Sequence, residues 1–302
     1  MLVSPGFDLG LMAVLGLLVG SFLNVVIHRL PLMLEAQWKS DCAELCGQPE
    51  TEPTEAFNLS VPRSRCPHCG HAIAWHENIP VLSYLLLRGK CSACAKPIAL
   101  RYPAVELVCG LLFLYCGAQW GFTPTGLAWS GFCACLLALA LIDWDTTLLP
   151  DDITLPLLWA GLLAALLQWT PVALPAAVWG VIAGYASLWL VNAGFKLLKG
   201  ERHPTHPVWD LAWWLHRHAT GKDGMGFGDF KLFAALGAWF GWQGLVPIIL
   251  MASVLGAVTG IAMKFSSGLR EGGYVPFGPF LSGAGVTAMV VGPAAMLRAV
   301  GL

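Results

Sequence analysis

Charged residues are scarce in this sequence: only 12% of its 302 residues are Asp, Glu, Lys or Arg, whereas 57% are hydrophobic. A water-soluble domain needs more charge than this to cover its surface, so the composition argues against a soluble globular protein. The mean hydropathy of +0.67 supports the same exclusion. The sequence therefore predicts a protein that lies largely within a membrane.

Several familiar sequence features are also absent. There is no repeat of fixed period, no low-complexity tract and no glycine-rich strand-to-helix turn of the kind that binds dinucleotides. The first apolar run, residues 9–27, has no basic segment before it and no small-residue cleavage site after it. We therefore expect a retained membrane span there and not a cleaved signal peptide.

Long apolar runs dominate what is present. A helix of roughly 20 apolar residues crosses the hydrocarbon core of a bilayer. Such runs predict an all-α membrane protein of about eight transmembrane helices, the sixth of them short. They lie at residues 9–28, 104–121, 125–142, 153–169, 173–195, 229–243, 246–264 and 277–298.

The basic residues test this number of spans. Of the 17 Lys and Arg residues, all but Arg298 fall in three polar segments, at residues 29–102, 196–231 and 264–276. Eight spans place all three segments on one side of the membrane, which the positive-inside rule makes cytoplasmic. Both termini are then expected on the periplasmic side.

The chain is accordingly divided into three parts. We expect a first transmembrane helix at residues 1–28, a cytoplasmic loop domain at 29–102 and a seven-helix core at 103–302 with a cytoplasmic insertion at 196–228. The insertion is rich in His and Trp between residues 196 and 222. The spacing of these residues matches no tight metal-ligand pattern, so an amphipathic helix at the membrane surface is favoured over a metal site.

Four cysteines of the loop domain form two C-x-x-C pairs. Two such pairs can complete a tetrahedral Zn²⁺ site, and because four protein ligands leave no position for water, such a site is structural. Redox-active pairs are the alternative, but no thioredoxin-like pattern surrounds them, and disulfides are unexpected in a reducing cytoplasm. A third pair, Cys42 and Cys46, is attributed to chance. The predicted ligands are Cys66, Cys69, Cys91 and Cys94.

Acidic residues lie at the cytoplasmic ends of two predicted spans. Asp143 ends the third span, and Asp229 begins the sixth after two glycines, Gly226 and Gly228. Two carboxyl groups brought together from different helices share a proton, so one can activate water while the other protonates an oxygen of the substrate. The alternative is that the acids are helix caps and interface anchors. That alternative suits Asp145, Asp151 and Asp152 better than it suits the first two.

The pattern L-I-D-x-D-x-x-x-L-P-D at residues 141–151 and the pattern G-x-G-D-F-K at 226–231 resemble the two aspartate motifs of the type IV prepilin peptidases. The G-x-G-D element is also similar to that of presenilin-like proteases. Further similarity lies at residues 20–31, at 101–103 with Glu106, and at 276–280. The resemblance therefore covers nearly the whole chain in the order that the family shows.

The resemblance implies a catalytic pair, Asp143 and Asp229, with Gly226, Gly228 and Lys231 supporting it. It also implies a bacterial inner-membrane endopeptidase that cleaves the leader of prepilins or pseudopilins after Gly at the cytoplasmic face. Many members of the family carry a tetracysteine domain in this first cytoplasmic loop. The expected partners are these substrates and the lipid bilayer, with no nucleic acid.

A second activity is implied by the resemblance alone. Members of the family commonly transfer a methyl group from S-adenosylmethionine to the new N-terminal amine. The candidate residues for the methyl-donor region are Asn24, Arg29, Arg101 and Glu106, each of which can equally be an interfacial cap or anchor. Two rival classes remain for the whole protein: a proton-coupled transporter, whose acids usually lie near the membrane midplane, and a non-enzymatic assembly factor.

Overall fold

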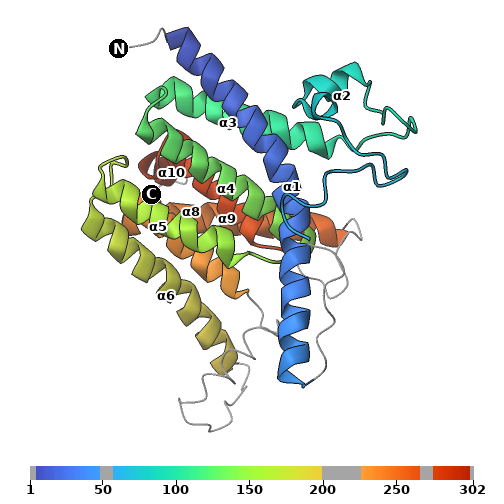
Figure 1. Ribbon diagram of the computed structural model, residues 1–302. Helices are drawn as coiled ribbons and strands as arrows, with labels where there is room; N and C mark the ends of the chain where they lie inside the picture. Colours follow the sequence, from blue (N-terminus) through green and yellow to red (C-terminus); the bar gives the residue numbers. More distant parts are fainter. Residues whose placement is uncertain (1–4, 48–56, 199–225, 266–274, 300–302) are drawn as a thin grey trace. The chain divides into compact units, whose positions relative to one another are not determined.

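A computed structural model describes residues 5–47, 57–198, 226–265 and 275–299 (Figure 1). Within these ranges the chain is helical and forms no strand beyond two isolated bridges in the loop domain. The predicted fold class, an all-α membrane protein, is therefore confirmed. The chain divides into two compact units, residues 1–146 and 147–302, each of which is described by itself.

Three long helices form the core of the first unit: α1 (Pro5–Leu45), α3 (Arg101–Trp120) and α4 (Pro124–Thr146), which pack against one another. Small residues let α1 approach α3 closely. A β-carbon on Gly20 would lie 2.7 Å from the α-carbon of Glu106, so only glycine fits at this crossing.

Helix α1 continues well beyond the predicted end of the first span at residue 28. Its 41 residues run to Leu45 with Pro31 inside the helix, and the side chains of residues 35–42 are exposed. The segment after Pro31 contains Leu, Glu, Ala, Gln and Lys, which favour helix, and no glycine, so nothing local ends the helix at the membrane surface.

The loop domain, residues 57–100, lies between α1 and α3 in sequence and consists mainly of turns. Its short helices are η1 (Trp75–Asn78) and α2 (Leu82–Leu86). Two long side chains hold it to the helices. Arg29 on α1 donates hydrogen bonds to the carbonyl oxygens of Asn58 and Pro62, at 2.9 and 2.6 Å. Glu106 on α3 accepts a hydrogen bond of 2.8 Å from the backbone N–H of Val81.

The second unit is built around α8 (Phe227–Phe265), which packs against each of the other described helices of the unit. These are α5 (Asp151–Leu166), α6 (Leu174–Leu198), α9 (Gly278–Val291) and α10 (Pro293–Ala299). Gly241, with φ 69° and ψ 175°, interrupts α8, so its halves correspond to the sixth and seventh predicted spans.

Five described helices are long and apolar enough to cross a membrane: α1, α3, α4, α6 and α8. Helix α9 is apolar but has only 14 residues, and α5 has 16. The protein is therefore a multi-pass membrane protein, and the number of eight spans stays a prediction. Most of the predicted insertion, at 199–225, lies outside the described residues, as does 266–274 of the third polar segment.

Candidate active site and thiol cluster

Asp143 lies in the last turn of α4 and is buried, with 4% of its surface exposed. Asp145 follows two residues later and therefore points to nearly the opposite side of the helix, about 200° away. Its carboxylate accepts two hydrogen bonds from the guanidinium of Arg101 on α3, at 2.9 and 2.5 Å. The local arrangement thus separates one buried acid from one ion-paired acid within a single turn.

Asp229 lies in the first turn of α8 and is also buried, with 3% exposed. Its backbone N–H donates to the carbonyl oxygen of Gly226 at 3.1 Å. A carboxylate in the first turn of a helix is stabilised by the helix dipole. Lys231, two residues later, instead donates to both carboxylate oxygens of Asp151 at the start of α5, at 2.7 and 2.6 Å.

The two glycines before Asp229 differ in what surrounds them. A β-carbon on Gly228 would lie 2.6 Å from the β-carbon of Leu149, so the segment before α5 packs directly on the glycine backbone. A β-carbon on Gly226 would lie 3.5 Å from Oδ2 of Asp229, an ordinary contact distance. The structure therefore requires a glycine at residue 228 more strongly than at residue 226.

These contacts distinguish the acids of the two motifs and the neighbouring Asp152. Asp145 and Asp151 pair with basic residues, Asp152 is exposed, and Asp143 and Asp229 are buried. The two buried acids belong to different units. Sequence reasoning missed both ion pairs, because it had no signal that joins Arg101 to Asp145 or Lys231 to Asp151.

The four cysteines of the two C-x-x-C pairs come together, with all four sulfur atoms within 4.8 Å of one another. The Sγ atoms of Cys66 and Cys94 are 3.9 Å apart, and those of Cys69 and Cys91 are 4.0 Å apart. Zn–S bonds of about 2.3 Å in a tetrahedron place the sulfurs about 3.8 Å apart. The cluster therefore fits a single tetrahedral metal ion, whereas exposed Cys42 and Cys46 lie outside it.

The two halves of the cluster have the same backbone design, 25 residues apart in sequence. Cys66 N–H donates to the carbonyl oxygen of His71, and Cys91 N–H donates to that of Lys96, both at 2.9 Å. The residue after each second cysteine, Gly70 or Ala95, has a positive φ, of 73° or 55°. Each half is thus a tight knuckle that turns its two sulfurs to one point.

The knuckle backbone also favours thiolates. The N–H groups of His68 and Cys69 lower the pKa of Cys66 to about 6. In the second knuckle the N–H groups of Cys94 and Ala93 lower the pKa of Cys91 in the same way. For Cys69 the N–H of His71 acts in that direction, but burial and the neighbouring thiols outweigh it and raise the pKa to about 12. Four thiols without a cation cannot all ionise, so the cluster is suited to a cation.

His71 lies two residues after Cys69, and its side chain contacts a carboxylate. Its Nε2 lies 3.2 Å from Oε2 of Glu77. The Ser92 hydroxyl, the Ala74 N–H and His71 together lower the pKa of Glu77 to about 2. The Glu77 carboxylate thus remains charged and contacts His71 beside the thiol cluster.

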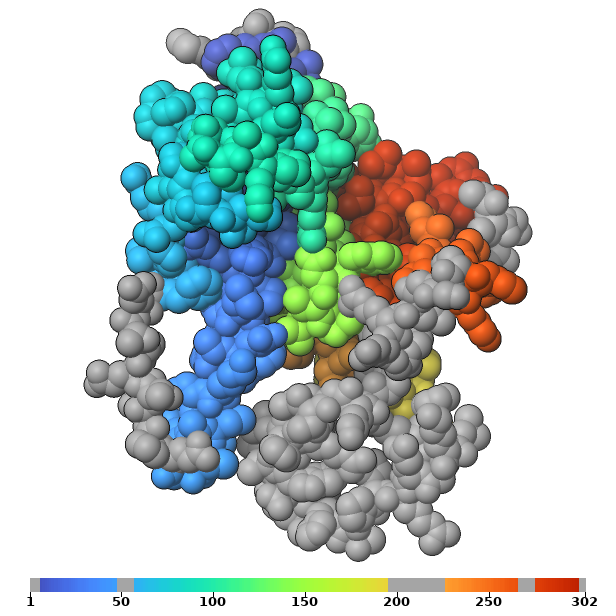
Figure 2. All heavy atoms as spheres, turned by 90° about the vertical axis from the view of Figure 1, so that its right-hand side faces the viewer, coloured from blue at the N-terminus to red at the C-terminus, as the bar shows by residue number. Residues whose placement is uncertain are grey.

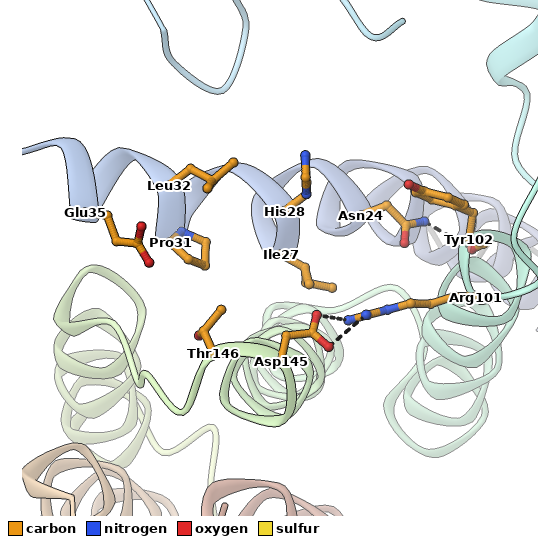
Figure 3. Close-up of a pocket in the computed structure, with 10 residues that line it drawn as sticks. All are labelled: Asn24, Ile27, His28, Pro31, Leu32, Glu35, Arg101, Tyr102, Asp145 and Thr146. Carbon is orange, nitrogen blue, oxygen red and sulfur yellow. Dashed lines mark hydrogen bonds and ion pairs between the residues drawn. The ribbon is translucent and has the colours of Figure 1, made fainter. Parts of the chain in front are cut away.

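A cavity of about 220 Å³ lies among α1, α3 and α4 of the first unit (Figure 3). Asn24 donates a 3.1 Å hydrogen bond to the carbonyl oxygen of Tyr102 on one side of it. The Arg101–Asp145 ion pair forms another part of the wall, and Glu35 points toward Thr146 at the far end (Figure 3).

The four candidate methyl-donor residues do not form one group in the structure. Asn24 and Arg101 line the cavity, whereas Arg29 and Glu106 do not. Those two are the side chains that tie the loop domain to α1 and α3. Their buried charges thus have structural partners, which the sequence alone did not reveal.

These features define a class: a multi-pass helical membrane protein with buried acids at two helix ends and a loop domain that carries a four-thiol cluster. Comparison with known families narrows the class. Residues 14–120 match the bacterial peptidase A24 N-terminal domain, and residues 130–261 match the type IV leader peptidase family. The chain belongs to this family.

Curated relatives agree over nearly the full length. The chain is 46% identical over 290 residues to a prepilin leader peptidase/N-methyltransferase of Burkholderia pseudomallei (strain 1026b), covering 95% of this chain and 86% of the relative. Proteins of the same name from Stutzerimonas stutzeri and Pseudomonas putida are 47% and 46% identical, covering 92% and 96% of this chain and 89% and 93% of theirs. No solved structure was found to match.

Proposed function

We propose that this protein is a prepilin leader peptidase and N-methyltransferase of the bacterial inner membrane, in which Asp143 and Asp229 form the proteolytic pair. The observation that carries this proposal is that each motif contributes one buried acid at a helix end, whereas the neighbouring acids are ion-paired or exposed. Family membership and the names of the relatives support the same activity.

In the proposed reaction, one carboxylate removes a proton from water, which attacks the carbonyl carbon of the glycine before the cleaved bond. The other carboxyl group first donates a hydrogen bond to the carbonyl oxygen and then protonates the departing amine. The product is a pilin or pseudopilin with a free N-terminal amine. This scheme requires one ionised and one protonated acid, and either residue of the proposed pair can take either role.

Chain connectivity supports the pairing. Leu149, which contacts Gly228 beside Asp229, is six residues after Asp143. Even fully extended, six residues span at most about 20 Å. The covalent chain therefore limits how far Asp143 can lie from Asp229.

Four single variants test the pair: Asp143→Asn and Asp229→Asn, each with a matched control, Asp145→Asn and Asp151→Asn. The controls remove an acid that lies nearby but is held in an exposed ion pair. We expect leader cleavage in membranes to be lost in the first two variants and kept in the controls, at equal protein levels. Cleavage by either Asp143→Asn or Asp229→Asn would reject the pair.

We also propose that the four-thiol cluster holds a structural Zn²⁺ ion. Its support is the spacing of the sulfurs and the N–H groups that favour thiolates. The ion would join the two knuckles and so order the loop domain. Purified protein should contain one zinc per chain under reducing conditions, and Cys69→Ser should lower this content while Cys42→Ser should not. A metal-free, reduced protein with an ordered loop domain would contradict the proposal.

For methyl transfer, we propose that Asn24 and Arg101 act at the cavity that they line. When bound, S-adenosylmethionine would supply the methyl group to the new N-terminal amine, which would lose a proton, and S-adenosylhomocysteine would be released. The cavity, at 220 Å³, is below the roughly 300 Å³ of small-molecule sites, so it has room for only part of the reactants. Because Asn24 lines this cavity and is not part of the proposed proteolytic pair, Asn24→Ala should yield pilin that is cleaved but less methylated, as measured by mass spectrometry. Full methylation in this variant would place the site elsewhere.

The proposed orientation has the loop domain in the cytoplasm and both termini in the periplasm. Reporter fusions at the two ends test it, because a periplasmic phosphatase is active only outside the cytoplasm. Active fusions at both ends are expected.

A further inference from the structure

The loop domain carries an unusual run of exposed apolar side chains. Residues 79–87 contain nine residues of which only Ser83 and Tyr84 bear a polar group. Leu85 and Leu86 are 65% and 72% exposed, and Leu82 is 49% exposed. Exposure of neighbouring leucine side chains to water is unfavourable, so residues 79–87 are expected to contact an apolar partner.

The contact with α3 fixes the height of the apolar segment relative to the membrane. Helix α3 has 20 residues and is about 30 Å long, so a transmembrane α3 matches the hydrocarbon thickness and has its two ends near the two interfaces. Glu106 is five residues inside α3, about 7.5 Å below the end at Arg101. Its carboxylate accepts the N–H of Val81 at 2.8 Å, and because helix side chains lean toward the N-terminus, this contact places Val81 between that depth and the interface.

The backbone at Val81 shows that this contact is imposed by its surroundings. Val81 has φ 60° and ψ −45°, a conformation that is a genuine outlier for a β-branched residue. Such a conformation persists only where neighbouring structure determines it. The strained residue is the one whose N–H reaches Glu106, and a carboxylate at that depth requires such a partner.

The basic residues next to the apolar segment are also consistent with contact with a bilayer. The apolar segment is followed at once by Arg88 and Lys90, both exposed. Basic residues at the end of an apolar segment bind the anionic headgroups of the inner leaflet. On α3 itself, Leu107 and Leu111 are 50% and 54% exposed, as expected of a lipid-facing surface at the same depth or below.

We infer that residues 79–87 are inserted into the inner leaflet of the membrane, with Arg88 and Lys90 at the headgroups, and that Glu106 is the positioning residue that holds them there. The partner of this surface is lipid. Figure 2 shows loop-domain atoms, in cyan and teal, on the surface of the molecule. The segment continues into the second knuckle, because Ile98 N–H bonds the carbonyl oxygen of Gly89, so the thiol cluster is expected next to the membrane surface.

The test measures depth directly. A fluorescent amino acid replaces Leu85 or Leu86, one at a time, in the full chain reconstituted into vesicles of phosphatidylethanolamine and phosphatidylglycerol. Two matched positions serve as references: Leu107 on the lipid face of α3, and exposed Lys39 near the end of α1. We expect nitroxide-labelled lipids to quench positions 85, 86 and 107 several-fold more than position 39, and aqueous iodide to quench position 39 the most.

Two outcomes would overturn the inference. Strong quenching of positions 85 and 86 by iodide, as at position 39, would show that the apolar segment faces water. Protection from both quenchers would show that protein covers it, either a second copy or another part of this chain.

Variants of Glu106 test the positioning role. Glu106→Ala removes the acceptor for Val81 N–H, whereas Glu106→Gln keeps a carbonyl oxygen that can accept it. We expect Glu106→Ala to increase iodide quenching at position 85 several-fold, and Glu106→Gln to leave it near the wild-type value. Equal quenching in both variants and the wild type would show that Glu106 does not position residues 79–87. Because quenching needs no catalysis, the result is independent of the proposed peptidase activity.

Discussion

Gly180 on α6 and Gly237 on α8 contact each other backbone to backbone: a β-carbon on either residue would overlap the carbonyl group of the other. Four residues further along α6, a β-carbon on Gly184 would lie 2.9 Å from the α-carbon of Ala234. Small residues spaced four apart are a common means of bringing membrane helices together. This crossing joins α6 to the helix that begins with Asp229.

We therefore predict that Gly180→Ala or Gly237→Ala destabilises the second unit by roughly 1–3 kcal/mol, the usual cost of overpacking. Gly194→Ala on the same helix is the matched control, because its β-carbon would meet no atom within 4 Å. Unfolding of the purified proteins in mixed detergent measures the difference. Equal stability of the three variants would contradict the close crossing.

Gly228 and Gly226 offer a second matched pair. Gly228→Ala forces the start of α8 away from Leu149, whereas Gly226→Ala meets only an ordinary contact. Since a displacement of about 1 Å can cost on the order of 100-fold in rate, we predict a large loss of leader cleavage for Gly228→Ala and little for Gly226→Ala.

Combining Gly228→Ala with Leu149→Gly removes the β-carbon that causes this clash, so the double variant should recover part of the lost cleavage. Leu149→Ala keeps that β-carbon and should not rescue. Rescue by both substitutions, or by neither, would show that the loss has another cause.

The positive-φ residue of each knuckle, Gly70 or Ala95, allows a prediction: Gly70→Ala should destabilise its knuckle, whereas Ala95→Gly should not. Gly70→Ala places a side chain at φ 73° with open space around it, so the cost is purely that of the left-handed backbone, roughly 1–2 kcal/mol. Ala95→Gly relieves the same strain at φ 55°, partly offset by the greater flexibility of glycine in the unfolded chain.

We expect Gly70→Ala to speed metal loss to a chelator and Ala95→Gly to slow it or leave it unchanged. The rate of metal release from the full chain measures both effects. Faster release from Ala95→Gly than from Gly70→Ala would contradict the shared knuckle geometry.

A variant of Arg29 distinguishes a role in holding the loop domain from a role in methyl transfer. Its two terminal nitrogens reach two carbonyl oxygens, and its Cζ lies 5.7 Å from the centre of the Phe57 ring. A lysine cannot reproduce this planar fork, so Arg29→Lys should loosen residues 57–62. The expected result is faster amide exchange there, with Arg88→Lys, an exposed residue, as the control. Unchanged exchange with lost methylation would restore Arg29 to the methyl-donor region.

Much of the helical framework was predictable because hydropathy is a local property. The apolar runs 104–121 and 125–142 correspond to α3 and α4 within a few residues. The four cysteines were predictable as a cluster because a C-x-x-C spacing already brings two sulfurs close. The extension of α1 to Leu45 was not expected, since a helix can leave the membrane without any change in its backbone pattern. The apolar segment at 79–87 was likewise read as part of a polar loop.

By itself, the sequence determined that the protein is helical, crosses a membrane, carries a four-cysteine site and places acids at the ends of two spans. Only the tertiary structure decided which of those acids are neutralised, because their partners are distant in sequence: Arg101 is 44 residues from Asp145, and Lys231 is 80 residues from Asp151. It also separated Asn24, at the cavity, from Arg29, which ties the loop domain to α1. Local patterns report periodicity and hydropathy, whereas a side chain's charge partner is set by which helices pack together.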